Sequence, residues 1–549
     1  MTTRNNARRG VVPVVAQAGT ALAPLIAVGV TNTIGLLLKP RELIRVLKAK
    51  PWILLILAAI AGGAWGLYTW ITAPAESRRG GTTVAVTGAA TGTDWSKVAL
   101  EIIRQRAMAP IPSAPASQAA ADPLAADATQ TAIPFRGNNG RSGHMGGPAP
   151  RGLQTTWAYY PYDDRFNMIL SSPLVAGGMV YGASCQLDPE GGSFGAVFCL
   201  DATTGVEQWL CEVAAPGTER YFTGFYSSPA LSADGQSLII GQGLHTDFDA
   251  ELLCLDAATG AVRWTVATPL HLESSPAIEG DLVVIGAGAV ENADSGKPEG
   301  DPDGRGNPGF VLGVRISTGE VVFRAPVADP ESAPILHQGI CYIGSGLNGS
   351  RVVALRTESD AELAAAGLKR VLWDVPSPFP ATGPITLIDD TVLVGCGKGD
   401  IVHTVKDPEG RVLALDAATG ATKWTVDMPD AVLGPIAVDG HFAAVPCRNG
   451  ELVAIDIAAE GSVLWRSRIK DDQPILAGAA IAGESVYALT NTGFLAIFER
   501  SDGTQVERHF INDRAGEMKL TTSAPIIAEG SVFVGSETGG LRRMVGAAP

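Results

Sequence analysis

One eleven-residue pattern occurs three times in this chain and constrains its fold more than any other feature. The copies read CLDATTGVEQW at 199–209, CLDAATGAVRW at 254–264 and ALDAATGATKW at 414–424. Each predicts a strand, a tight turn at Thr-Gly and a second strand closed by Trp. Glycine supplies the positive φ of the turn, and the Asp side chain accepts hydrogen bonds from turn amides. The Trp is large enough to bridge one sheet to the next. Such internal repetition decides the fold before any single strand is assigned.

Weaker copies keep the same frame. They place Phe323 and Trp465 where the close copies have their Trp, whereas another copy has Glu507 there and leaves its docking contact open. Residues 356–370 interrupt one more copy, so that Trp373 arrives late.

A second landmark, a small-residue step that opens an apolar strand, precedes each copy and recurs every 44 to 58 residues. That interval is the length of one four-stranded propeller blade. The chain is therefore predicted to form an all-β, eight-bladed β-propeller. The eight landmarks are Pro173, Pro229, Pro276, Pro334, Pro384, Pro435, Ala479 and Pro525.

The last landmark is followed by too few residues for four strands. A ring with an open edge in its last blade would not close. The lone strand predicted at 152–160, which contains Trp157, is therefore expected to supply the fourth strand of blade eight. On this basis the propeller domain extends over 132–549.

The segment Trp52–Thr72 has no charged residue and carries aromatic residues at both ends. At 1.5 Å per residue a helix over this segment spans roughly 30 Å, enough to cross a bilayer. A single transmembrane helix at 52–72 is therefore expected to precede the propeller. A cleaved signal peptide is the alternative, but the stretch begins late and is long for one.

Basic residues between 39 and 50 outnumber those that follow the helix. The positive-inside rule places residues 1–51 in the cytoplasm and the propeller in the periplasm of a bacterium, anchored by a single pass in the inner membrane. The apolar stretch 11–38 also contains prolines and polar residues, which leaves open an interfacial segment or a second crossing. Residues 73–131 have the composition of a linker, mostly disordered, with a short amphipathic helix at 95–106.

The formal net charge is −15, so there is no basic field for nucleic acid. No adjacent pair, CxxC or CxxCH occurs among the seven cysteines, and because their number is odd at least one thiol stays free or pairs with another chain. Cys199 and Cys254 take the place of Ala414 in the repeat, which favours inert core thiols. A disulfide between Cys185 and Cys199 is the alternative. The cysteines are Cys185, Cys199, Cys211, Cys254, Cys341, Cys396 and Cys447.

The repeats resemble the quinoprotein-type pattern A-x-D-x-x-T-G-x-x-x-W, which residues 414–424 match at every fixed position. The resemblance covers about 153–549, and PFRGNNGRSG at 134–143 looks like the opening motif of bacterial propellers of this type. The resemblance implies the propeller fold that two groups of bacterial proteins share. One comprises the periplasmic quinoprotein alcohol and glucose dehydrogenases. The other is BamB, the propeller subunit of the outer-membrane assembly machinery.

A fold does not determine a function, so a catalytic role has to be argued from particular residues. Quinoprotein alcohol dehydrogenases carry adjacent cysteines under their cofactor, and this sequence has none. The inserted loop 291–309 offers Asp301, Asp303 and Asn307 to calcium but lacks the closing Glu of a calcium loop. The seven histidines fall singly, and Gly-x-Gly pairs such as Gly286 and Gly288 are assigned to turns. No catalytic, cofactor-binding or metal-binding residue is assigned.

The remaining candidate site is the mouth of the channel, where Tyr226, Glu273, Glu331 and Thr522 are expected to gather. The favoured hypothesis is a non-enzymatic, membrane-anchored scaffold whose partners are membrane or envelope proteins, with a BamB-like assembly role as one form of it. The alternatives are a dehydrogenase that uses pyrroloquinoline quinone and a ligand-sensing propeller.

Overall fold

The computed structural model describes residues 136–137 and 141–547 apart from 163–167, 188–192, 215–219, 245–246, 248–249, 289–308, 347–348, 400, 402–404, 470–472, 514–517 and 529. The expected helices at 52–72 and 95–106, the stretch 11–38 and the linker 73–131 lie outside these residues. So does the loop 291–309, except for Gly309. Within the described part of the chain, no helix is long and apolar enough to span a membrane.

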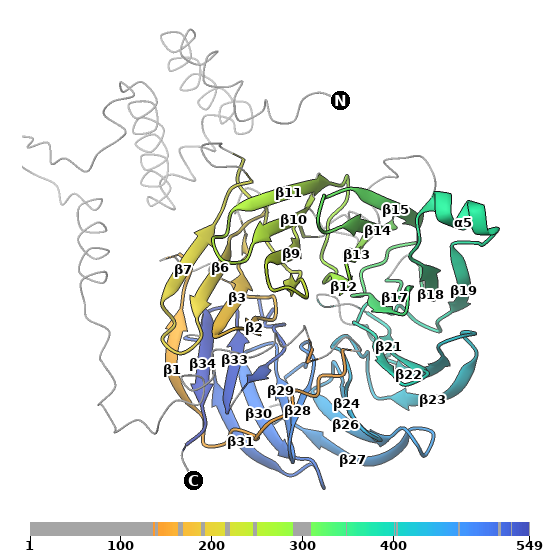
Figure 1. The fold of residues 1–549 in the computed structure, drawn as a ribbon. Helices are drawn as coiled ribbons and strands as arrows, with labels where there is room; N and C mark the ends of the chain where they lie inside the picture. Colours follow the sequence, from red (N-terminus) through yellow and green to blue (C-terminus); the bar gives the residue numbers. More distant parts are fainter. Residues whose placement is uncertain are drawn as a thin grey trace, which may run out of the picture. The chain divides into compact units, whose positions relative to one another are not determined.

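Eight antiparallel four-stranded sheets are arranged as blades around a common centre, which confirms the predicted propeller (Figure 1). In blades one to seven the strands follow one another in chain order from the centre outward. Blade one comprises β2 (Leu174–Ala176), β3 (Met179–Ala183), β6 (Val197–Asp201) and β7 (Glu207–Cys211). Blade two comprises β8 (Ala230–Leu231), β9 (Ser237–Gly241), β10 (Glu251–Asp256) and β11 (Val262–Ala267). Blade three comprises β12 (Ala277–Glu279), β13 (Leu282–Ala287), β14 (Phe310–Arg315) and β15 (Val321–Pro326). Blade four comprises β16 (Ile335–His337), β17 (Ile340–Gly344), β18 (Arg351–Arg356) and β19 (Val371–Pro376).

The second half of the ring repeats this plan, except that the outermost strand of blade eight comes from the start of the domain. Blade five comprises β20 (Thr386–Ile388), β21 (Thr391–Gly397), β22 (Gly410–Asp416) and β23 (Thr422–Met428). Blade six comprises β24 (Ala437–Asp439), β25 (Phe442–Pro446), β26 (Glu451–Asp456) and β27 (Ser462–Arg468). Blade seven comprises β28 (Ala480–Ala482), β29 (Ser485–Leu489), β30 (Phe494–Glu499) and β31 (Gln505–Phe510). Blade eight comprises β32 (Ile526–Ala528), β33 (Ser531–Gly535), β34 (Leu541–Val545) and β1 (Gln154–Tyr159). The described residues also form the hairpin of β4 (Gln186–Leu187) with β5 (Ser193–Phe194) and the helix α5 (Asp360–Ala366).

Blade eight is closed by the two ends of the domain, as the strand count predicted. β1 pairs antiparallel with β34, from Gln154 opposite Val545 to Tyr159 opposite Leu541. In Figure 1 the orange β1 accordingly lies beside the blue β34. The strand expected at 152–160 is thus observed over Gln154–Tyr159.

The hydrophobic core is divided among the interfaces between neighbouring blades. Each of the eight interfaces holds its own cluster of buried apolar side chains, including the one between blades eight and one. In blade two, for example, Leu253 packs toward blade one and Leu252 toward blade three. Successive side chains of a strand point to opposite faces, so an inner strand of a blade is apolar throughout.

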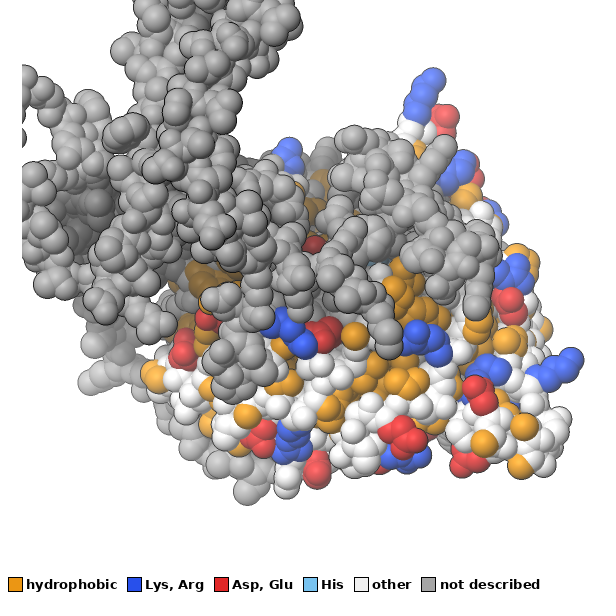
Figure 2. Space-filling model, turned by 90° about the horizontal axis from the view of Figure 1, so that it is seen from above, with side chains coloured by type: hydrophobic (Ala, Val, Ile, Leu, Met, Phe, Trp, Pro, Cys, Tyr) orange, Lys and Arg blue, Asp and Glu red, His pale blue; other side chains and the backbone are white. Residues whose placement is uncertain are grey.

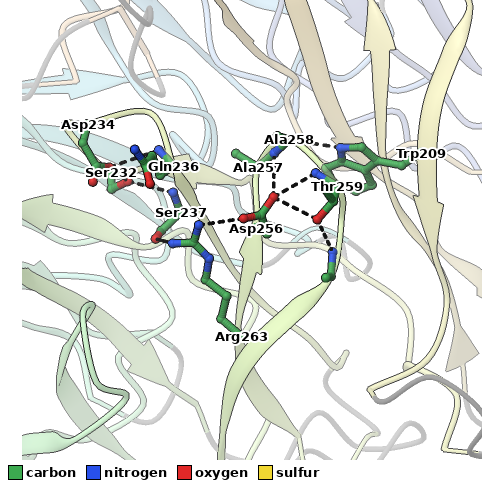
Figure 3. Close-up of polar contacts among 11 residues, drawn as sticks. Trp209, Ser232, Asp234, Gln236, Ser237, Asp256, Ala257, Ala258, Thr259 and Arg263 are labelled. Atoms are coloured by element: carbon green, nitrogen blue, oxygen red, sulfur yellow. Dashed lines mark hydrogen bonds and ion pairs between the residues drawn. The ribbon is translucent and has the colours of Figure 1, made fainter.

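The repeat explains how neighbouring blades are locked together (Figure 3). Asp256 accepts hydrogen bonds from the amides of Ala258 and Thr259 at 3.1 and 2.9 Å, and its second oxygen accepts from Arg263 at 2.7 Å. The indole of Trp209 in blade one then donates to the carbonyl of Ala257 at 3.0 Å. The indoles of Trp157, Trp264, Trp373 and Trp465 donate in the same way to a turn carbonyl of the next blade.

The turn glycine of the next blade provides the contact surface for this Trp. Gly260 has φ +71°, and a Cβ added there would lie 2.5 Å from the Trp209 ring. Side chains larger than hydrogen are excluded at this position for two separate reasons: the backbone conformation and the ring.

Small residues lie opposite the Trp in the adjoining strand. Cys199 pairs with Trp209, Cys254 with Trp264 and Ala414 with Trp424. Cys199 and Cys254 are buried and free, as predicted, and Cys185 is also free, so the alternative disulfide is not formed. Trp373, which follows the interruption at 356–370, is in the same register opposite Ala354. The extra residues form α5 and leave the docking position unchanged.

Two glycines assigned to turns serve another purpose. Gly286 lies inside β13, and an added Cβ would be 1.9 Å from the carbonyl oxygen of Pro330. At Gly288 an added Cβ would be 2.6 Å from the His271 ring. The turn assignment was wrong because these two glycines, inside and just after β13, permit close approach of other segments of the chain.

Candidate functional site: the channel and its mouth

The inner strands begin at one end of the channel, and serine side chains connect them there. The amide of Ser172 donates to the Ser228 hydroxyl at 3.0 Å, and the amide of Ser228 donates to the Ser275 hydroxyl at 2.9 Å. The amide of Ala524 donates to the Ser172 hydroxyl at 2.9 Å, and the Ser274 hydroxyl donates to the Ser332 carbonyl at 3.0 Å. These bonds form a belt from blade eight through blades one and two to blades three and four. The residues just before the landmark prolines thus fix the spacing of the inner strands.

The four residues predicted for the mouth come together around Tyr226. The Thr522 side chain and the charges of Glu273 and Glu331 all act on its hydroxyl. Burial and, to a smaller extent, the negative charge of Glu273 raise the pKa of Tyr226 well above its ordinary value. The prediction of a shared location is confirmed, although these residues belong to blades as far apart in sequence as two and eight.

Two further groups at this mouth were not predicted from the sequence. His271 and Asp329 are fully buried, and Asp329 has φ +48°. A Cβ added to Gly346 would lie 2.5 Å from a Glu331 oxygen and 2.8 Å from an Asp329 oxygen. The two carboxylates therefore lie close together over a glycine. The contact forms within blade four, because Gly346 follows β17 and its amide donates to the carbonyl of Asp329 at 2.7 Å.

The channel itself is occupied by the segment that precedes the first blade. We define the channel segment as Arg136, Gly137 and residues 141–145. The carbonyl of Ser142 accepts from the Val438 amide at 2.6 Å. The carbonyl of Gly143 accepts from the Ile481 amide at 2.8 Å, and the Met145 amide donates to the Ile481 carbonyl at 2.9 Å. The segment therefore runs parallel to β28 and contacts β24, which is where Figure 1 shows an orange trace.

Two fully buried arginines extend from this segment. Arg136 donates to the carbonyl of Ile436 at 3.1 Å and also to those of Pro435 and Ala479. Burial lowers its pKa to about 9.

Arg141 crosses to the opposite side of the ring and donates to the carbonyls of Ser275 and Pro276 at 3.0 and 2.9 Å. Burial, opposed by Cys341 and reinforced by the charge of Arg136, lowers its pKa to about 9 as well. The channel segment thus bonds to four blades, namely three, five, six and seven, from inside the channel.

The chemistry available at this site is polar recognition. Burial raises the pKa of Cys341, next to Arg141, to about 12, which makes it a poor nucleophile. Among the described residues no three or more His, Cys, Asp or Glu side chains are grouped so that they would hold a metal ion. The mouth offers the buried carboxylate of Asp329, the half-buried carboxylates of Glu273 and Glu331 and a phenol, which suit hydrogen-bond donors and cations.

A family model described as outer membrane protein assembly factor BamB matches residues 165–363 and 348–548, together more than half of the chain. The outer membrane protein assembly factor BamB of Bordetella pertussis is 22% identical over 201 residues, which cover 34% of this chain and 47% of that protein. The quinohemoprotein alcohol dehydrogenase ADH-IIG of Pseudomonas putida is 23% identical over 345 residues, covering 59% of this chain and 44% of that enzyme. The chain thus spans less than half the length of these curated relatives.

Among solved structures, the quinohemoprotein alcohol dehydrogenase of Comamonas testosteroni aligns with a TM-score of 0.53 at 14% identity. The alignment covers 79% of this chain and 83% of that one. A europium-containing methanol dehydrogenase aligns with a TM-score of 0.52 at 13% identity, covering 76% and 91% of the two chains. At these identities the likeness shows the fold alone.

Proposed function

The chain belongs to the PQQ_2 family of repeat proteins, whose model is described as outer membrane protein assembly factor BamB, and from this premise we propose that it is a non-enzymatic scaffold of the bacterial envelope. In this proposal the helix at 52–72 anchors the chain in the inner membrane and the propeller lies in the periplasm. Its partners are membrane or envelope proteins, and an assembly role like that named for its BamB relatives is one form of the proposal.

The observation that carries the proposal is the filled channel inside a closed ring. Arg136 and Arg141 occupy the centre, and their guanidinium groups donate to carbonyls of residues just before the inner strands. A protein built in this way offers its outer and end surfaces, held in fixed geometry, rather than a deep cleft for a substrate.

The rim of the ring supports contact with proteins rather than with nucleic acid. On the face that Figure 2 shows, basic and acidic side chains lie in small mixed groups between apolar ones. On the side of the ring away from that face, Val463 and Leu464 are adjacent in β27 and are 41% and 51% exposed. Exposed apolar side chains among mixed charges suit a protein partner.

The test is affinity purification of the full-length tagged chain from membranes in mild detergent. The proposal predicts one or more envelope proteins in a fixed ratio to the propeller. Leu464→Glu is expected to lower their recovery if β27 is the contact, with Val321→Glu on β15, which is 42% exposed, as the matched control. Recovery of the isolated chain alone, also after cross-linking in cells, would contradict the scaffold function.

A quinone-dependent dehydrogenase is the second candidate, because ADH-IIG matches over 59% of the chain. The scaffold proposal is preferred because Arg136 and Arg141 are buried at the centre of the ring, where a planar quinone would have to displace them. The measurement is addition of pyrroloquinoline quinone and Ca²⁺ to the full-length chain. Stoichiometric binding together with dye reduction by alcohols or aldoses would replace the scaffold proposal by this one.

A further inference from the structure

The two ends of the ring expose different kinds of apolar side chain. The strands of a blade alternate in direction, and the inner strands begin at the mouth of the channel. The connections between second and third strands, and those between blades, therefore lie at the mouth end. Among the described residues, the exposed aromatic and methionine side chains all lie at this end and are 39% to 61% exposed. They are Phe194, Tyr221, Phe510 and Met518.

The opposite end, where the hairpin turns lie, exposes aliphatic side chains instead. Val206 is in the turn between β6 and β7, Val321 is the first residue of β15 and Val371 is the first residue of β19. Single aliphatic residues are common on protein surfaces, whereas aromatic residues and methionine are enriched where proteins bind one another. The mouth end is therefore the better candidate for a docking surface.

Three of the exposed side chains adjoin a small apolar cluster beside the channel. Its half-buried members are Tyr226, Leu244 and Leu520, and its buried members are Met168, Leu170 and Cys185. Met518 precedes Leu520 by two residues. The Ser193 hydroxyl, next to Phe194, accepts from the Gly224 amide at 2.7 Å, which brings β5 beside the loop of Tyr221. We define the mouth patch as Phe194, Tyr221, Tyr226, Leu244, Met518 and Leu520. It extends over blades eight, one and two.

Two buried carboxylates hold the loops that carry the mouth patch. Asp247 accepts from the Ser193 hydroxyl at 2.6 Å and from the Leu244 amide at 2.8 Å. Glu537 accepts from the amides of Met518 and Leu520 at 2.8 and 3.1 Å. Loops that are fixed in this way lose little conformational freedom when a partner binds. The exposed apolar side chains are thus presented in a preorganised arrangement.

Negative charge borders the mouth patch on the side of blade three. Glu273 and Glu331 are half-buried and lie just before blades three and four. Both charges act on the Tyr226 hydroxyl, and that of Glu273 also acts on the Cys185 thiol. A basic side chain at this border would be attracted by these carboxylates.

The basic side chains of the patch loops do not neutralise this border. Arg220, which precedes Tyr221, is paired with Glu251 at 2.6 Å. Lys519 is exposed at the other border, toward blade eight. The surface is therefore complementary to a segment that is apolar along most of its length and basic at one end.

From these features we propose that the mouth patch is the docking surface for an envelope protein, whose bound segment carries large apolar side chains next to lysine or arginine. The apolar side chains pack on Phe194, Tyr221 and Met518, and the basic side chain lies toward Glu273. This docking role rests on the scaffold function and adds to it the surface and the chemistry of the partner. Because β27 is on blade six, the two surfaces can be tested separately.

Methyl NMR of the full-length protein in detergent, with labelled methionine methyl groups, locates the binding site. The probe is a synthetic peptide in which Leu and Phe residues precede two arginines, with Gly and Ser at the other positions. The signal of Met518 is expected to shift on binding, whereas that of Met428, which is buried in β23, should stay unchanged. A peptide that shifts neither signal, or both equally, would contradict docking at the mouth patch.

Two further peptides separate the charge from the apolar contacts. Glu in place of both arginines is expected to weaken binding at least about tenfold, and Ser in place of the Leu and Phe residues should abolish it. Equal affinities of the arginine and glutamate peptides would refute the negative border as part of the docking surface.

A pair of variants tests the exposed side chains themselves. Tyr221→Ser with Met518→Ser is expected to weaken binding of the arginine peptide roughly tenfold or more in fluorescence anisotropy. Val206→Ser with Val321→Ser, which removes two exposed side chains from the opposite end, is the matched control and should leave the affinity unchanged. Since all four side chains are exposed, both variants are expected to fold.

An unchanged affinity of the mouth-patch variant would overturn the proposal. So would a Met518 signal that shifts with protein concentration alone, because a second copy of the chain would then cover the patch.

Affinity purification of the same variants distinguishes this docking role from the scaffold function. Envelope proteins should be lost from Tyr221→Ser with Met518→Ser and retained by Val206→Ser with Val321→Ser. Full recovery with both variants would leave the scaffold function intact and refute the mouth patch. If the unmodified chain recovers no partner, the scaffold function is contradicted, and the peptide titration decides on the mouth patch alone.

Discussion

The carboxylate of Glu507 in blade seven accepts a hydrogen bond from the backbone amide of Gly152 at 2.7 Å. It also accepts one from the amide of Leu153 at 3.4 Å. Glu507 occupies the position where the other repeats have Trp or Phe, and blade eight has no hairpin turn there because its outer strand comes from the start of the domain. A Trp or Phe side chain at this position would have had no turn glycine to pack against. The carboxylate of Glu507 accepts hydrogen bonds from backbone amides there instead. The docking contact at Glu507, which the sequence left open, is therefore this pair of hydrogen bonds.

Glu507→Ala is expected to lower the free energy of unfolding by about 2 kcal/mol, because it leaves two amides at the ring closure without an acceptor. Urea denaturation followed by tryptophan fluorescence measures the change. Glu320→Ala, at a side chain that is 73% exposed, is the control and should stay within about 0.5 kcal/mol of the unmodified protein. Equal effects of the two substitutions would contradict the closure role of Glu507.

Gly260→Ala is expected to destabilise the protein by roughly 2–4 kcal/mol, because the new Cβ meets the Trp209 ring and the backbone is left-handed. Gly280→Ala separates these two causes. Gly280 has φ +59° but nothing within 4 Å of an added Cβ, so only the backbone cost of about 1 kcal/mol applies. Thermal unfolding of both variants provides the comparison, and a Gly260 variant no weaker than the Gly280 variant would count against Trp docking as the lock.

The thiols are expected to be unreactive in the folded protein. Burial raises the pKa of Cys254 to about 11 and that of Cys341 to about 12, so that little thiolate exists at pH 8. Only Cys211 is half-buried, and it should react slowly with a colorimetric disulfide reagent. In denaturant all seven should react at once, and several fast-reacting thiols in the native protein would refute the buried arrangement.

Stability is expected to fall in acid through the turn carboxylates. Hydrogen bonds from Arg263 and Thr259 hold the pKa of Asp256 below its ordinary value of 3.8. Because the folded-state pKa is the lower one, this contribution is complete above the unfolded-state value and is lost as the pH falls through the folded-state value. The free energy of unfolding, measured with urea at several pH values, should therefore decline less steeply toward acid pH for Asp256→Asn, which is a flatter acid limb of the stability curve, than for the unmodified protein. Asp407→Asn, in an exposed loop, should leave the limb unchanged.

The sequence was sufficient to predict the propeller because the motifs that indicate this fold are local. Each Asp-x-x-Thr-Gly turn and its Trp lie within eleven residues, and the landmark prolines precede inner strands as expected. The gathering of Tyr226 with Thr522 could also be predicted, because equivalent positions in a ring of repeats face one channel.

The channel segment could not be predicted, since its contacts depend on the completed ring. Arg136 bonds to a carbonyl 343 residues away, and Arg141 to one 134 residues away. Neither acceptor has a signature in the sequence, because every residue carries a carbonyl. Only the stacking of blades determines which carbonyls turn toward the centre. Asp329 was missed for another reason: it contacts Gly346 within blade four, but no motif in the sequence marks either residue.

Ring closure by the two ends of the domain has a consequence for biosynthesis. Thr156 of β1 donates to the carbonyl of Arg543, which the ribosome adds 387 residues later. Throughout that interval the first strand has no partner, and its neighbour in the ring does not yet exist. The propeller can therefore complete its cooperative fold only after the nascent chain is nearly finished. Until then an unpaired strand edge, prone to aggregation, has to be shielded.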